Sequence, residues 1–213
     1  MSLLALDASG EAAGLAIQAE DGEILFRRHL PTRPGLIERL PALLEEAAQS
    51  TRITGVAVTI GPGSFTGLRT AIAIAAGFAA AAGLPLAGVT VAEAYRAAFP
   101  QLHRPLWVAL RARPNRIFLL RDARAEAFGD ADLPGSKAPV ALAGSAANEA
   151  AARLAASGTD VLLTNARQLD PAWVALAARA GAAAGLKPHA AEPVYVDPPE
   201  ARPAAGLRPP PAP

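Results

Sequence analysis

The sequence contains no cysteine in 213 residues, and its net charge is only +1. The first absence excludes disulfide bridges, thiolate nucleophiles and zinc sites built on sulfur, and it leads us to expect a cytoplasmic protein. The small net charge argues against a module that binds RNA by itself, because such modules gain much of their affinity by neutralising phosphates. Any contact with RNA should therefore be local or be made through a partner.

The N-terminus also lacks the basic segment and the small-residue cleavage site of a signal peptide. Hydrophobic residues make up 52% of the chain, enough for one or two small domains with a packed core. Residues 71–88 carry no charge and are numerous enough to span a bilayer. However, they are mainly alanine and glycine, and Gly83-Leu84-Pro85 interrupts them. We therefore expect a buried helix and no contact with a membrane.

The first half of the sequence reads as strands followed by alternating helices and strands. Asp21-Gly22 between two strand-like runs is a strong signal for a two-residue hairpin. An apolar stripe at helical spacing runs from Leu36 to Ala48, and Pro41 either bends this helix or marks its true start. Thr90 and Glu93 form a capping box for a later helix. The predicted strands are 3–7, 14–19, 23–29, 53–60 and 85–89.

The second half repeats this order loosely, with helices capped by Ser145 and Asp170. Its predicted strands are 106–110, 117–121, 140–143 and 161–164. We expect one domain over residues 1–100, a second, more divergent one over residues 101–196, and a flexible proline-rich tail over residues 197–213.

The sharpest motif is Gly-Pro-Gly-Ser-Phe-Thr-Gly-Leu-Arg at residues 61–69, between a strand and a helix. Glycines permit a tight turn, and the start of a helix carries partial positive charge that suits a phosphate. A capped turn, or an Asx-turn that only satisfies the backbone near the first strand, explains the pattern equally well. The candidate phosphate- or nucleotide-binding residues are Asp7, Ser9, Gly61, Gly63, Ser64, Thr66 and Gly67.

The helix that follows the motif, predicted over residues 64–82, has no strongly polar side chain after Thr70. A helix that is apolar all round must be covered on every side. The second domain or the tail could supply this cover, but the small side chains favour close approach by a helix of a partner protein. The predicted partner interface consists of Leu36, Leu40, Leu43, Arg69, Ala71, Ile72, Ala75 and Ala79.

The remaining candidate groups are histidines and arginines. His29, His103 and His189 are far apart, and none has a second ligand at metal-binding spacing, so we predict no metal site and no catalytic residue. Six arginines lie between residues 103 and 124. They are consistent with contact to RNA or to an acidic partner, and equally with an ordinary solvated face.

The motif at residues 61–69 resembles the hallmark of the TsaB family, also called glycoprotease-like proteins. Further segments resemble the family in the same order along the chain, closely up to about residue 95 and loosely from 100 to 190: Leu4–Ser9, Leu40-Pro41, Pro85–Val89 and Pro193–Val196. The resemblance implies an α/β, actin-like ATPase (ribonuclease H-like) fold. Such a fold has two similar domains, each with a mixed sheet and flanking helices.

The resemblance also implies a function. The family's catalytic relative, TsaD, transfers threonylcarbamoyl to an adenosine of tRNA with the help of a His-x-x-x-His metal motif, which this chain lacks. TsaB members act as non-catalytic scaffolds that pair with TsaD through their first two helices and form homodimers when alone. The ATPase TsaE completes the complex. No intrinsic cofactor is implied; ATP or ADP and Mg²⁺ would bind at the complex interface, and tRNA would be contacted indirectly.

Two positions depart from the family pattern. Gly35 lies where the family often has histidine, and Arg111 replaces an acidic residue at the opening of the second domain. The alternative function is a stand-alone actin-like ATPase or phosphotransferase, in which Asp7, Ser9 and Gly63 hold nucleotide and Mg²⁺. It requires a second carboxylate from the other domain, and Arg111 occupies the place where that carboxylate is expected.

Overall fold

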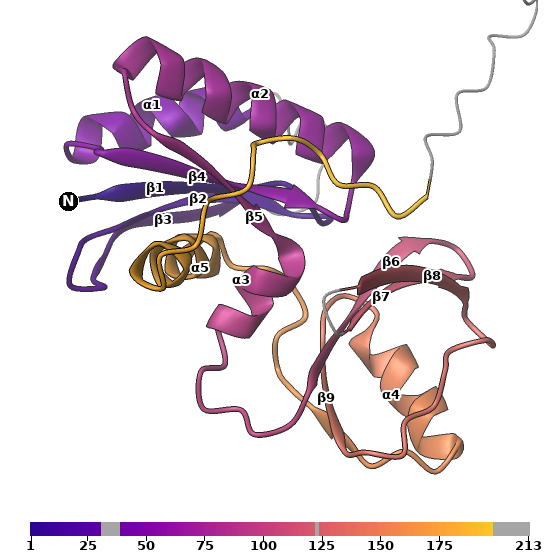
Figure 1. The fold of residues 1–213 in the computed structure, drawn as a ribbon. Helices are drawn as coiled ribbons and strands as arrows, with labels where there is room; N and C mark the ends of the chain where they lie inside the picture. The colour runs from indigo at the N-terminus through magenta and orange to yellow at the C-terminus, as the bar shows by residue number, and fades with distance from the viewer. Residues whose placement is uncertain (31–38, 122–123, 198–213) are drawn as a thin grey trace, which may run out of the picture.

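A computed structural model describes residues 1–30, 39–121 and 124–197, which form two five-stranded sheets at opposite ends of the molecule (Figure 1). In the first sheet the strand order is β3-β2-β1-β4-β5. Strands β1, β2 and β3 form an antiparallel meander, whereas β4 and β5 run parallel to β1. The bounds are β1 Leu3–Asp7, β2 Ala13–Gln18, β3 Ile24–Leu30, β4 Gly55–Gly61 and β5 Leu86–Thr90.

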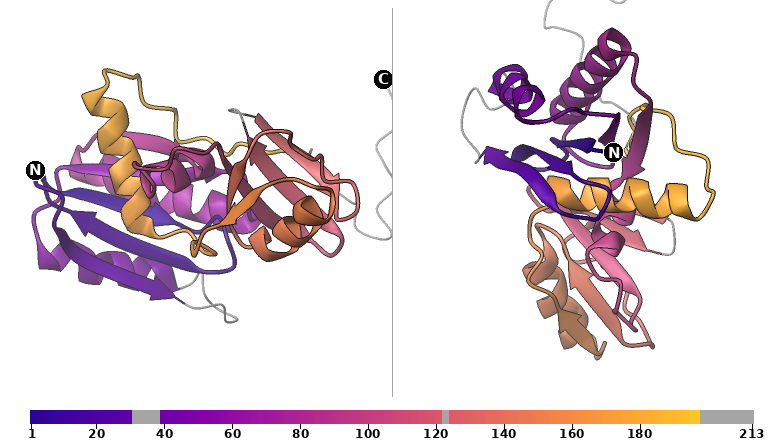
Figure 2. Two further views of the ribbon diagram at one scale, coloured as in Figure 1. Left: turned by 90° about the horizontal axis from the view of Figure 1, so that it is seen from below. Right: turned by 90° about the vertical axis from the view of Figure 1, so that its left-hand side faces the viewer.

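Helices cover both faces of the first sheet (Figure 1, Figure 2). Alternate residues of a strand point to opposite faces. Accordingly, Leu4 and Leu6 pack in the core beneath α1 and α2, while Ala5 faces the core formed with α3 and α5. The helices are α1 Leu40–Ser50, α2 Phe65–Ala82, α3 Val91–Ala97 and α5 Pro171–Ala183. This double cover explains why the short strand β1 is apolar at consecutive positions.

The second sheet repeats the topology of the first. Its order is β10-β9-β6-β7-β8, again an antiparallel meander of three strands with two further strands parallel to the first of them. Helix α4 Ala147–Ala156 packs on one face of this sheet, and Val91 and Tyr95 of α3 pack on strands β6, β7 and β9 at the other face. The strands are β6 Leu106–Arg113, β7 Arg116–Arg121, β8 Arg124–Gly129, β9 Val140–Ala143 and β10 Val161–Leu163. Two mixed sheets with flanking helices confirm the predicted α/β, actin-like fold class.

Several local predictions are refined by the structure. Helix α1 begins at Leu40, with Pro41 in its first turn, so the proline marks the start of the helix. The hairpin between β2 and β3 has a three-residue loop, because Ala19 N donates to Glu23 O at 2.8 Å. Gly22 takes a φ of 94° at its end. The capping box of Thr90 and the cap of α5 by Asp170 are confirmed.

One local prediction is wrong, and one strand was missed. Ser145 does not cap α4, since its hydroxyl oxygen accepts a hydrogen bond from Arg111 N at 2.9 Å and the cap position is Ala146. Strand β8 was not predicted, because its alternating Arg124, Ala125, Glu126 and Ala127 include alanine, a weak strand former. Pairing with β7 overrides that local preference.

The C-terminal part of the described chain returns to the first sheet. Helix α5 crosses that sheet (Figure 2), although the predicted boundary at residue 100 assigns it to the second domain. Residues 188–197, which we call the C-terminal strap, then run back along the first sheet to the second sheet. Almost the whole predicted tail, residues 198–213, lies outside the described residues, as does Leu36.

Candidate functional site

The turn after β1 is bonded to the start of α2. Ser64 N donates to Ser9 O at 2.7 Å, and Ser9 N donates to Asp7 Oδ1 at 3.0 Å. The second bond is the Asx-turn that the sequence left as an alternative. Asp7 is 4% exposed, and burial raises the pKa of its carboxyl group, although hydrogen bonding with Ser9 and Thr59 acts in the opposite direction.

Glycines are required here because backbones approach closely. A Cβ on Gly63 would lie 2.1 Å from Ser9 O, and one on Gly67 would lie 2.0 Å from Ala8 O. Gly61 has a φ of 114°, and a Cβ there would lie 2.6 Å from Val194 O. The geometry therefore explains all three glycines by packing of the loop on neighbouring backbone.

Some backbone amides at the start of α2 already have hydrogen-bond acceptors within the chain. Ser64 caps α2, since its hydroxyl oxygen accepts a hydrogen bond from Gly67 N at 3.2 Å, whereas Thr66 is exposed in the first turn. The structure thus brings Asp7, Ser9, Gly63 and Ser64 together, and two of the amides that would face a phosphate already donate within the protein. Nucleotide binding at these residues stays a prediction.

The predicted partner interface needs correction. Leu40, Leu43, Ala71, Ile72, Ala75 and Ala79 all lie in the core between α1, α2 and the first sheet. Their side chains cannot form an outer surface in this conformation. Of the predicted set, Arg69 is exposed. The sequence could not distinguish the inner face of α2 from its outer face, because both are apolar.

The outer face of α2 is exposed and built of small residues. Only 33% of the helix is buried, although its mean hydropathy is 1.5. By length and composition it could cross a membrane, but core helices of globular proteins meet the same criteria, and α2 packs on the first sheet through Leu68, Ala71 and Ala75. The exposed positions are Phe65, Thr66, Arg69, Ala73, Gly77, Ala80, Ala81 and Ala82.

An aromatic and cationic cluster lies at the N-terminal end of this face. The guanidinium carbon of Arg69 is 4.0 Å from the centre of the Phe65 ring, and its Nε donates to Tyr195 Oη at 2.8 Å. The Phe65 and Tyr195 rings are 5.4 Å apart. Since Tyr195 belongs to the C-terminal strap, residues far apart in sequence build this cluster.

The C-terminal strap is held along its length. Gly88 N donates to His189 O at 2.9 Å, and Val194 N donates to Ile60 O at 2.7 Å. At its end, Asp197 accepts hydrogen bonds from Arg116 Nη2 at 2.6 Å and Nε at 2.9 Å. Hydrogen bonding by Arg116 lowers the pKa of Asp197. The strap therefore connects β4 and β5 of the first sheet with β7 of the second.

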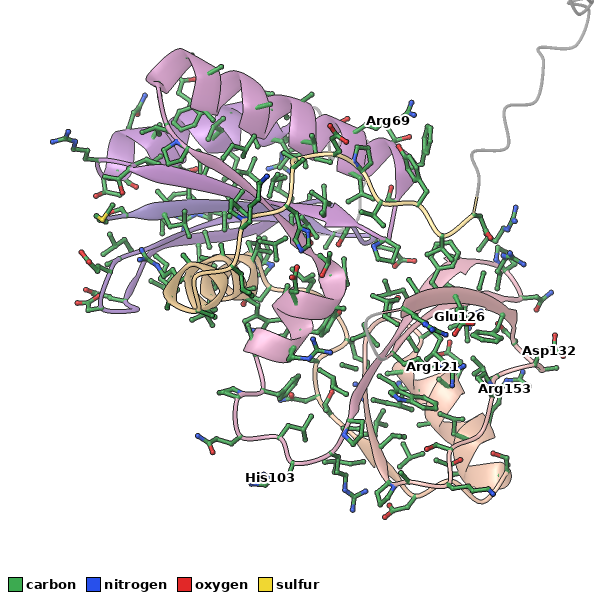
Figure 3. All side chains as sticks on the ribbon, viewed as in Figure 1. Arg69, His103, Arg121, Glu126, Asp132 and Arg153 are labelled. Atoms are coloured by element: carbon green, nitrogen blue, oxygen red, sulfur yellow. The ribbon has the colours of Figure 1, made fainter. Side chains whose placement is uncertain are left out.

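Most arginines between residues 103 and 124 pair with carboxylates of the same chain. Arg111 Nη1 lies 2.6 Å from Asp130 Oδ1 and Nη2 lies 3.5 Å from Glu149 Oε1. Arg121 pairs with Glu126 at 3.3 Å (Figure 3). This internal neutralisation favours the solvated face over an RNA-binding surface.

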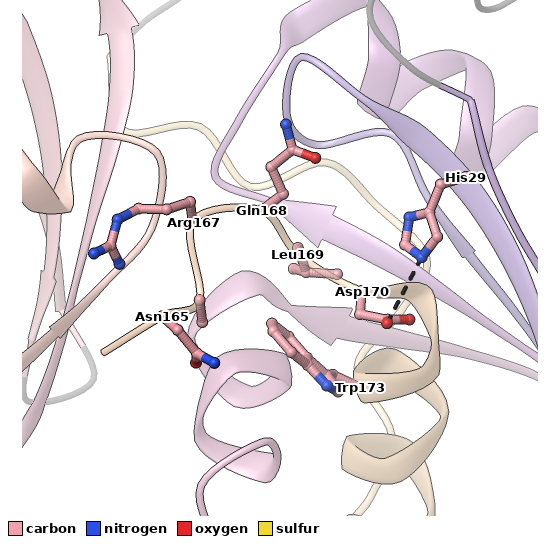
Figure 4. A pocket seen from close by; sticks show the side chains of 8 residues that line it. His29, Asn165, Arg167, Gln168, Leu169, Asp170 and Trp173 are labelled. Atoms are coloured by element: carbon pink, nitrogen blue, oxygen red, sulfur yellow. Dashed lines mark ion pairs between the residues drawn. The ribbon is translucent and has the colours of Figure 1, made fainter. Parts of the chain in front are cut away.

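An open pocket of ≈ 380 Å³ lies between the end of β3 and the segment that leads into α5 (Figure 4). Its wall includes Trp173 and Leu169, and His29 Nε2 lies 3.6 Å from Asp170 Oδ2 across it. None of the predicted nucleotide-binding residues lines it. Among the residues that the structure describes, no three histidine or carboxylate side chains gather as a metal site would require.

Known proteins of tRNA modification are similar to this chain. A family model described as TsaD, tRNA N6-adenosine threonylcarbamoyltransferase, matches residues 23–138. The tRNA threonylcarbamoyladenosine biosynthesis protein TsaB of Haemophilus influenzae is 32% identical over 136 residues, which cover 61% of this chain and 57% of that protein. TsaB of Escherichia coli K12 is 37% identical over 94 residues, covering 42% of this chain and 40% of that protein.

The chain belongs to the TsaB family. The part of the chain that matches the TsaD family model includes helices α1 and α2 and the motif at residues 61–69. The chain spans less than two thirds of the length of the TsaB proteins from the two bacteria.

A solved structure, YeaZ from Pseudomonas aeruginosa, shares the fold of this TsaB-family chain. It superposes with a TM-score of 0.66 at 23% identity, covering 91% of this chain and 99% of that one. The shared architecture therefore extends through the second sheet, where the sequence resemblance is loose.

Proposed function

We propose that this chain is a non-catalytic scaffold subunit in threonylcarbamoyladenosine modification of tRNA, which pairs with and activates a TsaD-like transferase. The outer face of α2 carries this proposal. An 18-residue helix of mean hydropathy 1.5 leaves two thirds of its residues incompletely covered by its own chain. Exposed apolar surface of this kind marks sites of protein association.

The composition of that face suits a helix as partner. Ala73, Gly77 and Ala80 recur at spacings of three and four residues, so they share one side of α2. Small side chains allow two helices to approach closely. A stable interface buries on the order of 1,600 Å² in total, so α1 and the cluster around Arg69 would contribute alongside α2. Alone, the chain forms a homodimer through the same face.

In the proposed scaffold role, the TsaD-like partner carries out the catalytic chemistry. The three histidines are isolated in sequence, and two amides at the start of α2 are engaged by Ser9 and Ser64. In this proposal ATP or ADP and Mg²⁺ bind at the complex interface, a TsaE-like ATPase joins the complex, and tRNA is contacted through the transferase. The assembly works in the cytoplasm.

Reconstituted tRNA modification tests the proposal. The TsaD-like subunit from the same organism is supplied with the TsaE-like ATPase, ATP, threonylcarbamoyl-adenylate and tRNA, with and without this chain. Modified adenosine is expected only when the chain is present, and the chain alone should give none. Equal product without the chain would refute the scaffold role and make intrinsic ATPase activity the next property to measure.

A further inference from the structure

Among the residues that the structure describes, three arginines stack on aromatic rings, and two of these three also bind a carboxylate. Arg28 lies 5.0 Å from the Phe26 ring and pairs with Glu46 at 3.2 Å. Arg121 lies 5.2 Å from the Trp107 ring and pairs with Glu126.

Arg69 is the most closely stacked of the three, at 4.0 Å from the Phe65 ring. Within the described parts of the chain it has no carboxylate partner.

The orientation of Arg69 is fixed by the fold. Phe65 holds one face of the guanidinium, and the hydroxyl oxygen of Tyr195 accepts from Nε, so the two terminal amino groups are the donors left for another molecule. Tyr195 is itself held because Val194 N is bonded to Ile60 O. A guanidinium that is already oriented loses little entropy when a carboxylate binds to it in a bidentate manner.

We propose that Arg69 binds an aspartate or glutamate carboxylate of the protein that covers the outer face of α2, and that Tyr195 is the positioning residue for this contact. The inference rests on the proposed function, because it assigns the chemistry of one contact in that interface. Figure 3 shows Arg69 at the outer side of α2. On the same face lie Ala73 and Gly77, four and eight residues further along the helix.

The surroundings of Arg69 favour a carboxylate of a protein over a phosphate of RNA. Phe65 and Val194 are each 42% exposed, so apolar surface flanks the arginine. The small apolar residues of α2 continue the surface beyond it. A strand of phosphates would gain nothing from these neighbours, whereas a protein interface would bury them around the ion pair and shield it from water.

The test measures the affinity of the full chain for the TsaD-like subunit by isothermal titration calorimetry at two salt concentrations. Arg69→Gln should weaken binding about 30-fold or more and reduce its dependence on salt, as expected when one partner of a buried charge pair is lost. Arg69→Lys should recover only part of the affinity, because a lysine cannot bind a carboxylate through two parallel hydrogen bonds. Tyr195→Phe should weaken binding about threefold to tenfold, since the hydrogen bond alone is removed.

Arg153→Gln provides the matched control. Arg153 is an exposed arginine on α4, in the other half of the molecule (Figure 3), and its replacement should leave affinity unchanged. Circular dichroism checks that each variant keeps the melting temperature of the wild type.

Three outcomes would overturn the inference. If the wild type does not bind the TsaD-like subunit, the proposed function fails and this inference fails with it. If the wild type binds and Arg69→Gln binds equally well, the inference alone is wrong. If Arg69→Gln weakens binding of tRNA in a filter assay and leaves the protein pair intact, the arginine recognises phosphate instead of carboxylate.

Discussion

Ser64 N donates a hydrogen bond to Ser9 O at 2.7 Å, which ties the start of α2 to the turn after β1. The two residues are 55 positions apart in sequence, and the contact requires glycines on the helix side. As a result, the helix with the exposed apolar face is anchored directly to the central strand of the first sheet.

Replacement of the glycines at this contact should destabilise the protein. Gly63→Ala and Gly67→Ala each place a methyl group about 2 Å from a backbone oxygen, so we expect each to lower the free energy of unfolding by roughly 3 kcal/mol. Gly77→Ala, at an exposed helical position with no atom within 4 Å of the new Cβ, should instead raise it by about 0.5–1 kcal/mol. Urea denaturation measures all three values. Equal stability of Gly63→Ala and the wild type would contradict the close approach.

Substitutions at two alanines of α2 should distinguish an effect on folding stability from an effect on partner binding. Ala75 is fully buried, so Ala75→Glu should cost roughly 3–5 kcal/mol and largely unfold the chain. Ala73 is exposed on the opposite side, and Ala73→Glu should change stability by less than about 0.5 kcal/mol while preventing association. Size-exclusion chromatography with light scattering and thermal melts measure both effects. Retention of the wild-type complex by a folded Ala73→Glu variant would exclude this face.

The buried carboxyl group of Asp7 should make stability depend on pH. Because its pKa is raised in the folded state, the folded protein binds the proton more tightly, and stability falls as pH rises from about 4 through that raised pKa. Asp7→Asn removes this dependence, so its stability relative to the wild type should increase with pH. Urea titrations between pH 4 and 8 measure the difference, with exposed Asp132→Asn as control. A difference that decreases with pH would contradict the burial effect.

The C-terminal strap should loosen when its terminal ion pair is removed. Asp197→Asn loses the charge that binds Arg116, and we expect the Val194 amide to exchange its hydrogen about fivefold faster, the factor that corresponds to about 1 kcal/mol. Glu192→Gln, at an exposed strap position, is the control and should leave the rate unchanged. Because the pKa of Asp197 is lowered, the wild type should show the same loss of protection, measured against the intrinsic exchange rate at each pH, only when the pH falls through that lowered value.

Local signals in the sequence were sufficient for most of the secondary structure and for the fold class. Strand β1, the capping box at Thr90 and the cap at Asp170 depend on interactions within a few residues. The nonapeptide at residues 61–69 marked the loop that is bonded to Ser9, although the sequence could not distinguish a phosphate site from a closely packed turn. That distinction depends on a backbone oxygen more than fifty residues away.

The sequence by itself therefore determined most of the helices and strands, the absence of cysteine chemistry, and the family motif. Only the tertiary structure decided which side of the apolar helix α2 faces the sheet, which placed Ala75 in the core and Ala73 outside. It also joined Tyr195 to Arg69 across 126 positions. The physical reason is that helical periodicity fixes which residues share a face, whereas burial of a face depends on chain segments that arrive from elsewhere in the sequence.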